Sequence, residues 1–66
     1  MDEISQKILN KLKEEKGFIA LNDKSPADNI YDMFGISKKT FKKAIGSLYK
    51  ARLITMEENG IKLKQN

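Results

Sequence analysis

Apolar residues recur along much of this chain at the spacing of amphipathic helices. In residues 2–16 they fall on one stripe of such a helix: Ile4, Ile8, Leu9 and Leu12. Acidic residues come first in this segment and lysines last, each at the helix end where the macrodipole favours that charge. We therefore expect a first helix over residues 2–16, with Gly17 supplying a left-handed cap that ends it.

A short apolar run at residues 18–21 predicts a brief strand, or an extended segment that leads into a turn. The next residues carry helix-start signals, because Ser25 can cap, Pro26 suits the first helical position and Asp28 completes a capping box. Gly35 would end this second helix. Its predicted apolar face consists of Ala27, Ile30, Met33 and Phe34.

A tight turn at residues 35–37 predicts a third helix, which Ser37 can cap and which should run over residues 38–51. Its apolar stripe consists of Phe41, Ala44, Ile45, Leu48 and Tyr49. At these spacings the two aromatic residues are expected in the core and not on a platform for stacking bases.

The last segment predicts a β-hairpin that turns at residues 59–60, because Asn-Gly is the strongest short signal for a type I′ turn. A two-residue loop there would pair Met56 with Leu63 and point both toward the core. The order helix, strand, helix, tight turn, helix, hairpin predicts an α+β winged helix–turn–helix, in which the hairpin is the wing. We expect residues 1–66 to form a single domain of this kind.

The composition makes an enzyme improbable on chemical grounds. The 66 residues include no cysteine and no histidine, so the chain has no disulfides, no thiolate ligands and none of the commonest general base. A nucleophile would need a lysine or carboxylate partner in a pocket. The aspartates Asp23, Asp28 and Asp32 lack the spacing of a calcium loop. We expect no catalysis, no cofactor and no metal.

Nothing in the sequence indicates a membrane partner. No apolar run approaches the roughly 18 residues that a membrane span requires, and the acidic N-terminus does not resemble a secretory signal. The lack of cysteine agrees with a cytoplasmic location, and we expect a cytoplasmic monomer.

The net charge of +4 is modest, but its distribution is uneven. Residues 35–56 contain no carboxylate, and they hold six basic residues: Lys38, Lys39, Lys42, Lys43, Lys50 and Arg52. On a helical wheel Lys39, Lys43, Gly46 and Lys50 lie opposite the apolar stripe, with Lys42 on one flank. Like charges four residues apart repel, and a polyanion would remove that repulsion. The sequence therefore predicts nucleic-acid contacts by the helical lysines Lys38, Lys39, Lys42, Lys43 and Lys50.

The residue types favour phosphate contact over base reading. The first turns of the third helix contain no Asn, Gln or Arg that could form bidentate contacts with base edges. The wing tip carries Glu57 and Glu58, which would oppose phosphate. The sequence thus predicts a non-catalytic, sequence-tolerant nucleic-acid-binding module with a regulatory role.

Two alternatives remain open at this level. The lysines could instead form a solvated surface, or dock an acidic protein or neighbouring domains, because fold does not fix function. Gly46 costs a helix roughly 1 kcal/mol relative to alanine. It could let a nucleic-acid backbone approach, or it could accommodate packing of the first helix.

Three pieces of the chain carry a family resemblance: residues 23–25, residues 34–39 and residues 41–46. Over residues 17–63 the chain resembles the C-terminal domain of the conserved virulence factor B (CvfB/YitL) family. In that family a winged-helix domain follows several S1-type RNA-binding domains in bacterial proteins. The resemblance implies a domain excised from the C-terminus of a longer protein, preceding S1-type domains as partners, and RNA rather than DNA as the ligand.

Overall fold

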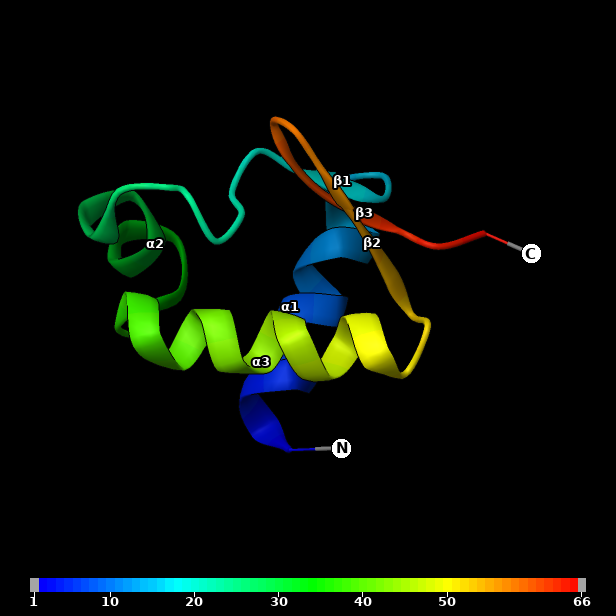
Figure 1. Cartoon of the computed structure of the whole chain (residues 1–66), viewed down its shortest axis with the longest axis horizontal. Coiled ribbons are helices and arrows are strands. Elements are labelled where there is room, and N and C mark those ends of the chain that lie inside the picture. Colours follow the sequence, from blue (N-terminus) through cyan, green and yellow to red (C-terminus); the bar gives the residue numbers. More distant parts are fainter. Residues whose placement is uncertain (1, 66) are drawn as a thin grey trace.

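The computed structural model, which describes residues 2–65, consists of three helices and a small antiparallel sheet (Figure 1). The first and third helices pack against the sheet, and the second helix packs against the third. The elements are α1 (Glu3–Glu14), β1 (Phe18–Ile19), α2 (Ala27–Phe34), α3 (Lys38–Lys50), β2 (Ile54–Glu57) and β3 (Gly60–Leu63). The strand order is β1-β3-β2, so the last strand is central. In Figure 1, α3 runs horizontally below the sheet, α2 lies at the left end of α3 and the hairpin rises above. This is the predicted winged helix–turn–helix.

The first helix begins at an aspartate cap and ends in a left-handed turn. The carboxylate of Asp2 accepts a hydrogen bond from the backbone N–H of Ser5 at 2.7 Å, and this bond lowers the pKa of Asp2. At the other end Lys16, with φ 61°, is the first left-handed residue. Gly17 was predicted to hold that position, but it follows one residue later with φ 94° and donates to the carbonyl of Leu12 at 2.6 Å.

The start of α2 contradicts the predicted capping box. Pro26 is the N-cap residue, and no side chain caps this helix. The hydroxyl oxygen of Ser25 accepts from the backbone N–H of Asn22 at 2.9 Å instead. Ser25 thus stabilises the preceding turn, because a short serine side chain can satisfy local backbone groups in either direction. Gly35 ends α2 with φ 68°, as predicted.

The third helix follows the predicted bounds closely. The hydroxyl of Ser37 accepts from the backbone N–H of Thr40 at 3.1 Å, which confirms the cap. The predicted stripe is buried except for Tyr49, whose side chain is 54% exposed. Tyr49 lies about 80° from Phe41 around the helix. The chain leaves the helix soon afterwards, and nothing covers the ring.

Phe41 lies at the centre of the core with no exposed surface. Its ring stacks on Phe34 with the ring centroids 5.7 Å apart, which joins α3 to α2. The core predicted from the sequence is buried as expected: Ile8, Leu12, Ile30, Phe34, Phe41, Ile45 and Leu48. The prediction that Ala27 and Met33 belong to the apolar face of α2 is wrong, since both residues are exposed.

The hairpin is present, but its register differs from the prediction by two residues. Met56 pairs with Ile61, and Ile54 pairs with Leu63. The loop therefore consists of residues 58–59, and no residue in it has a positive φ. A shift of two residues keeps the alternation of the two strands, so the wing was predicted correctly and its turn was not. Leu63 is partly buried against the core as predicted, but Met56, which was expected to point toward the core, is 38% exposed.

Gly60 explains the error. A Cβ atom at Gly60 would clash with the carbonyl oxygen of Ile19 and with the ring of Phe18, because β1 lies directly against β3. The glycine is thus required by a close approach of two strands and not by the turn.

Replacing Phe41 by alanine should lower the free energy of unfolding by about 3–5 kcal/mol, the usual range for a buried phenylalanine. Denaturant unfolding measures the loss, and Tyr49→Ala, on the exposed side of the same helix, serves as the matched control with a small effect. A loss below roughly 1 kcal/mol for Phe41→Ala would contradict the assigned core.

Candidate nucleic-acid interface

The burial of the α3 stripe turns the predicted site residues toward solvent. We refer to Lys38, Lys39, Lys42, Lys43 and Lys50 as the lysine face. All of them are exposed except Lys38, which is half-buried. From Lys39 to Lys50 the face extends about 16 Å along the helix axis, at 1.5 Å per residue.

The lysine face has no close carboxylate partner in the part of the chain that the structure describes. The one ion pair within residues 2–65 joins Lys11 to Glu15 on α1, with 3.8 Å between nitrogen and oxygen. The positive charges of α3 are therefore not neutralised by direct contacts.

Carboxylates nevertheless flank the N-terminal half of α3, which the sequence order does not reveal. On one side Lys39 and Lys43 line a groove together with Asp2 and Glu3 from the start of α1. On the other side Lys38 shares a shallow hollow with acidic residues of α2: Asp28 and Asp32. The positive potential of this half is accordingly reduced at both flanks.

The C-terminal end of α3 has a different environment. A cleft of about 390 Å³ lies between this end and the sheet. We call it the C-terminal cleft, and it is lined by Tyr49, Lys50, Arg52, Ile54, Thr55 and Lys64. No carboxylate lines this cleft, which holds three cations, although Glu57 accepts a hydrogen bond from the hydroxyl of the lining residue Thr55 at 2.8 Å.

Sequence reasoning missed three members of this cleft. Arg52 belongs to the basic run of residues 35–56, which was a signal, but it lies beyond the helix. Lys64 reaches the cleft through the hairpin register, and its backbone N–H donates to the carbonyl of Leu53 at 2.9 Å. Tyr49 was assigned to the core. Their convergence depends on where the chain turns after α3.

Gly46 lies within the lysine face and has no packing role. A Cβ atom built on it would have no neighbour within 4 Å. The interpretation that the glycine accommodates the first helix is therefore wrong. Because it has no side chain, the glycine leaves a gap on the helix surface between the lysines, and it lowers the helix propensity of this segment.

The acidic wing tip is held away from α3. The side-chain amide of Asn22 donates to the backbone carbonyls of Glu57 and Glu58, each at 3.1 Å. These bonds tie the tip to the turn before α2, near the top of Figure 1, whereas α3 lies below the sheet. The backbone of the wing tip therefore lies away from α3, and the Glu57 carboxylate accepts a hydrogen bond from the Thr55 hydroxyl at 2.8 Å.

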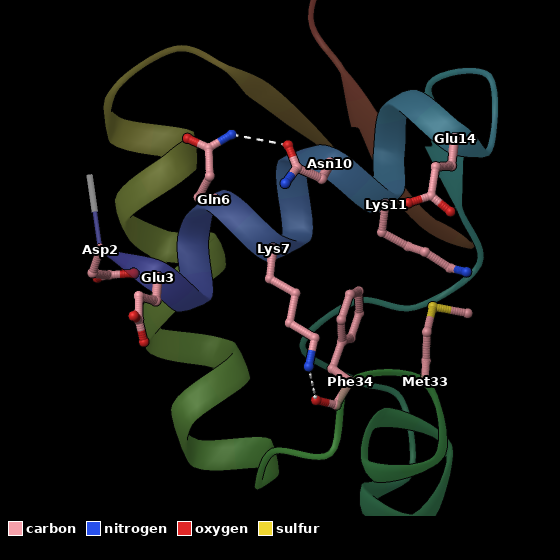
Figure 2. A pocket seen from close by; sticks show the side chains of 9 residues that line it. All are labelled: Asp2, Glu3, Gln6, Lys7, Asn10, Lys11, Glu14, Met33 and Phe34. Atoms are coloured by element: carbon pink, nitrogen blue, oxygen red, sulfur yellow. Dashed lines mark hydrogen bonds between the residues drawn. The ribbon is translucent and has the colours of Figure 1, made fainter.

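A further hollow lies between α1 and the end of α2 (Figure 2). There the Lys7 ammonium group donates to the backbone carbonyl of Phe34 at 2.9 Å. This bond satisfies a carbonyl at the end of α2 that has no partner within the helix. The hollow carries both signs of charge and includes no residue of α3, and we assign it a structural role.

Residues 2–65 contain neither a candidate metal site nor a candidate membrane span. No group of three or more acidic residues is arranged to hold a metal ion there. Within the same residues no helix combines the length and apolar character that crossing a bilayer would require.

The sequence of residues 6–63 matches the family model for the CvfB-like winged helix domain. The chain belongs to this family. The helices and the wing described above thus form a CvfB-like winged helix domain.

Relatives of this CvfB-like winged helix are longer proteins. The conserved virulence factor B of Staphylococcus saprophyticus is 42% identical over 65 residues, which are 98% of this chain and 22% of that protein. The protein of the same name from Staphylococcus aureus strain USA300 is 40% identical over 63 residues, which are 96% of this chain and 21% of that protein. The chain thus spans about a fifth of the length of these relatives.

A solved structure shows the same domain within a larger chain. It is a multidomain protein with nucleic acid binding domains from Streptococcus pneumoniae. It superposes on this CvfB-like winged helix with a TM-score of 0.94 at 45% identity, covering 97% of this chain and 22% of that one.

The open space at Gly46 leads to a stability prediction for this CvfB-like winged helix. Gly46→Ala should raise the free energy of unfolding by about 0.5–1 kcal/mol, because alanine favours the helix and meets no neighbour. Denaturant unfolding measures the gain. Gly35→Ala is the matched control and should lose stability, because φ 68° strains any residue with a Cβ. A loss of stability in Gly46→Ala would show that the position is packed after all.

Proposed function

We propose that this CvfB-like winged helix is a non-catalytic nucleic-acid-binding module with a regulatory role, which binds RNA rather than DNA through the lysine face. The observation that carries this proposal is the row of lysines on the exposed side of α3, none within ion-pairing distance of a carboxylate in residues 2–65. The residues proposed to contact phosphate are Lys38, Lys39, Lys42, Lys43 and Lys50.

The energetics of the lysine face favour a polyanionic ligand. Lys38 and Lys42, and likewise Lys39 and Lys43, are like charges four residues apart, which destabilise an isolated helix by a few tenths of a kcal/mol per pair. Phosphates would remove this repulsion and release counterions. Gly46 adds to the argument, since a residue without a side chain between the lysines would let a strand lie close to the helix.

The flanking carboxylates favour a single strand over a DNA duplex. When a helix–turn–helix inserts its recognition helix into the major groove, the preceding helix crosses the phosphate backbone. In this chain that helix is α2, whose Asp28 and Asp32 would meet phosphates there. A single strand that runs from Lys39 along the lysine face to the C-terminal cleft would avoid Asp28 and Asp32. Proteins that bind single strands without sequence preference use a positively charged groove of this kind.

The proposed binding tolerates many sequences. Lysine contacts phosphate as a point charge and carries little sequence information. The wing tip makes no contribution, because it is tied to Asn22 and lies away from α3.

The lengths of the relatives indicate how the module works. This chain matches 22% of the pneumococcal protein, described as having nucleic acid binding domains, and the resemblance to the CvfB/YitL family implies preceding S1-type RNA-binding domains. We therefore infer that residues 1–66 act as a C-terminal unit beside S1-type domains. The unit would extend the strand bound by those neighbours and raise its effective concentration at the lysine face.

Replacing Lys39 and Lys43 together by alanine should weaken binding to all unstructured RNA strands alike. If about four phosphates are neutralised, the slope of log K against log salt is roughly −3 for a single strand, and the double variant should flatten it by about one to two units. Fluorescence anisotropy of a labelled strand, titrated at several salt concentrations, measures both quantities. RNA, DNA and duplex versions of one sequence test the ligand class.

Two further variants serve as controls for the double lysine variant. Replacing Glu57 and Glu58 by glutamine should leave binding unchanged or tighten it, since the wing tip lies away from α3 and the Glu57 carboxylate, bonded to Thr55, would only oppose phosphate. Asp2→Asn should tighten it, because asparagine also caps helices and removes a charge from the groove that holds Lys39. If the double lysine variant binds nucleic acid as well as the parent and loses binding to an acidic polypeptide instead, the lysine face is a protein-docking surface.

A further inference from the structure

We propose that Tyr49 is a stacking platform for one nucleobase, with Lys50, Arg52 and Lys64 holding the phosphates beside it. This inference rests on the proposed function and names a base-binding position within it. The sequence placed Tyr49 in the core, so the position follows from the structure alone.

Tyr49 is available for stacking. Its side chain is 54% exposed and lines the C-terminal cleft. The other exposed tyrosine, Tyr31, is 64% exposed but lies with Asp28 and Asp32, which would repel a phosphate backbone. Tyr31 shares its hollow with Lys38 as well as with the two carboxylates, whereas the hollow of Tyr49 is lined by cations and by no carboxylate.

The end of α3 places Arg52 in the cleft through a Schellman motif. The backbone N–H of Leu53 donates to the carbonyl of Leu48, and the N–H of Arg52 donates to the carbonyl of Tyr49, each at 3.0 Å. Arg52 takes the left-handed position with φ 62°, where glycine is usual. An arginine there strains the backbone, because its Cβ crowds the following carbonyl oxygen. The helix macrodipole favours a cation at this end of α3 but offsets only part of that strain.

Lys64 arrives from the other side of the cleft. The pairing of Ile54 with Leu63 sets the base of the hairpin. The hydrogen bond from the Lys64 N–H to the Leu53 carbonyl then fixes the strand end next to the turn after α3. Two chain segments thus bring cations to one tyrosine, and no carboxylate lines the cleft.

This combination suits an unpaired nucleotide. Proteins that bind single strands without sequence preference combine a positively charged groove with aromatic rings on which bases stack. Every base has a π-face, so the stacking tolerates any sequence, as the lysine contacts do. A base within a duplex is already stacked on both faces and is not available to Tyr49.

The composition of the chain allows a direct optical test. The protein has two tyrosines and no tryptophan, so in the Tyr31→Phe variant all tyrosine emission comes from Tyr49. Titration with an unstructured oligoadenylate RNA should quench this emission, whereas an abasic strand of the same length should not. In the matched variant Tyr49→Phe, emission comes from Tyr31 and should stay constant. Quenching of Tyr31 alone, or equal quenching by both strands, would overturn the proposal.

A binding experiment separates this inference from the proposed function. Tyr49→Ala should weaken oligoadenylate binding about fivefold or more while leaving the salt slope unchanged, because it removes stacking and no charge. Tyr49→Phe should bind as the parent does. Arg52→Gly should reduce both affinity and slope, although glycine relieves the left-handed position and should stabilise the fold.

The two proposals fail in different ways. If Tyr49→Ala binds RNA as tightly as the parent while the Lys39 and Lys43 double variant does not, the stacking platform is wrong and the lysine face stands. If neither variant changes RNA binding, both proposals are wrong. Thermal unfolding of each variant confirms that the comparison is made between folded proteins.

Discussion

The burial of the apolar stripe of α3 is the constraint on which the rest of the structure depends. Phe41, fully buried at its centre, contacts Phe34 of α2, and the same stripe packs against α1 and β2. Because the stripe faces the core, the period of 3.6 residues per turn places the lysines on the outward side of the helix. One interaction therefore holds a small core together and presents the charges that we propose bind RNA.

The distribution of charge around α3 is a property of the tertiary structure. Along the sequence, the basic run is free of carboxylates, but the fold brings Asp2 and Asp28 to opposite flanks of the N-terminal half of the helix. The same fold brings Lys64 to the C-terminal end, where no carboxylate lines the cleft. Carboxylates thus line the hollows beside the N-terminal half of α3 but not the cleft at its C-terminal end, and that cleft is also lined by an exposed aromatic ring.

Periodicity predicted the three helices, the core and the side on which the lysines lie, because these depend on local spacing and on burial of one face. The errors arose where a residue serves a distant partner. Gly60 is a glycine because β1 approaches it, so the Asn-Gly turn signal gave the wrong register. Ser25 bonds to the preceding turn and not to α2. Tyr49 has the spacing of a core residue, but its exposure depends on where the chain goes after α3, and the members of the C-terminal cleft could not be predicted for the same reason.

The most direct test of the account is the amide chemical-shift map of the ¹⁵N-labelled protein titrated with an unstructured RNA strand. We predict that the largest changes follow α3 from Lys39 through Gly46 to Lys50 and continue into Arg52 and Lys64, while the wing tip stays unchanged. Changes confined to the face of α2 around Tyr31, or to the hollow between α1 and α2, would contradict the assignment of the lysine face as the RNA-binding surface.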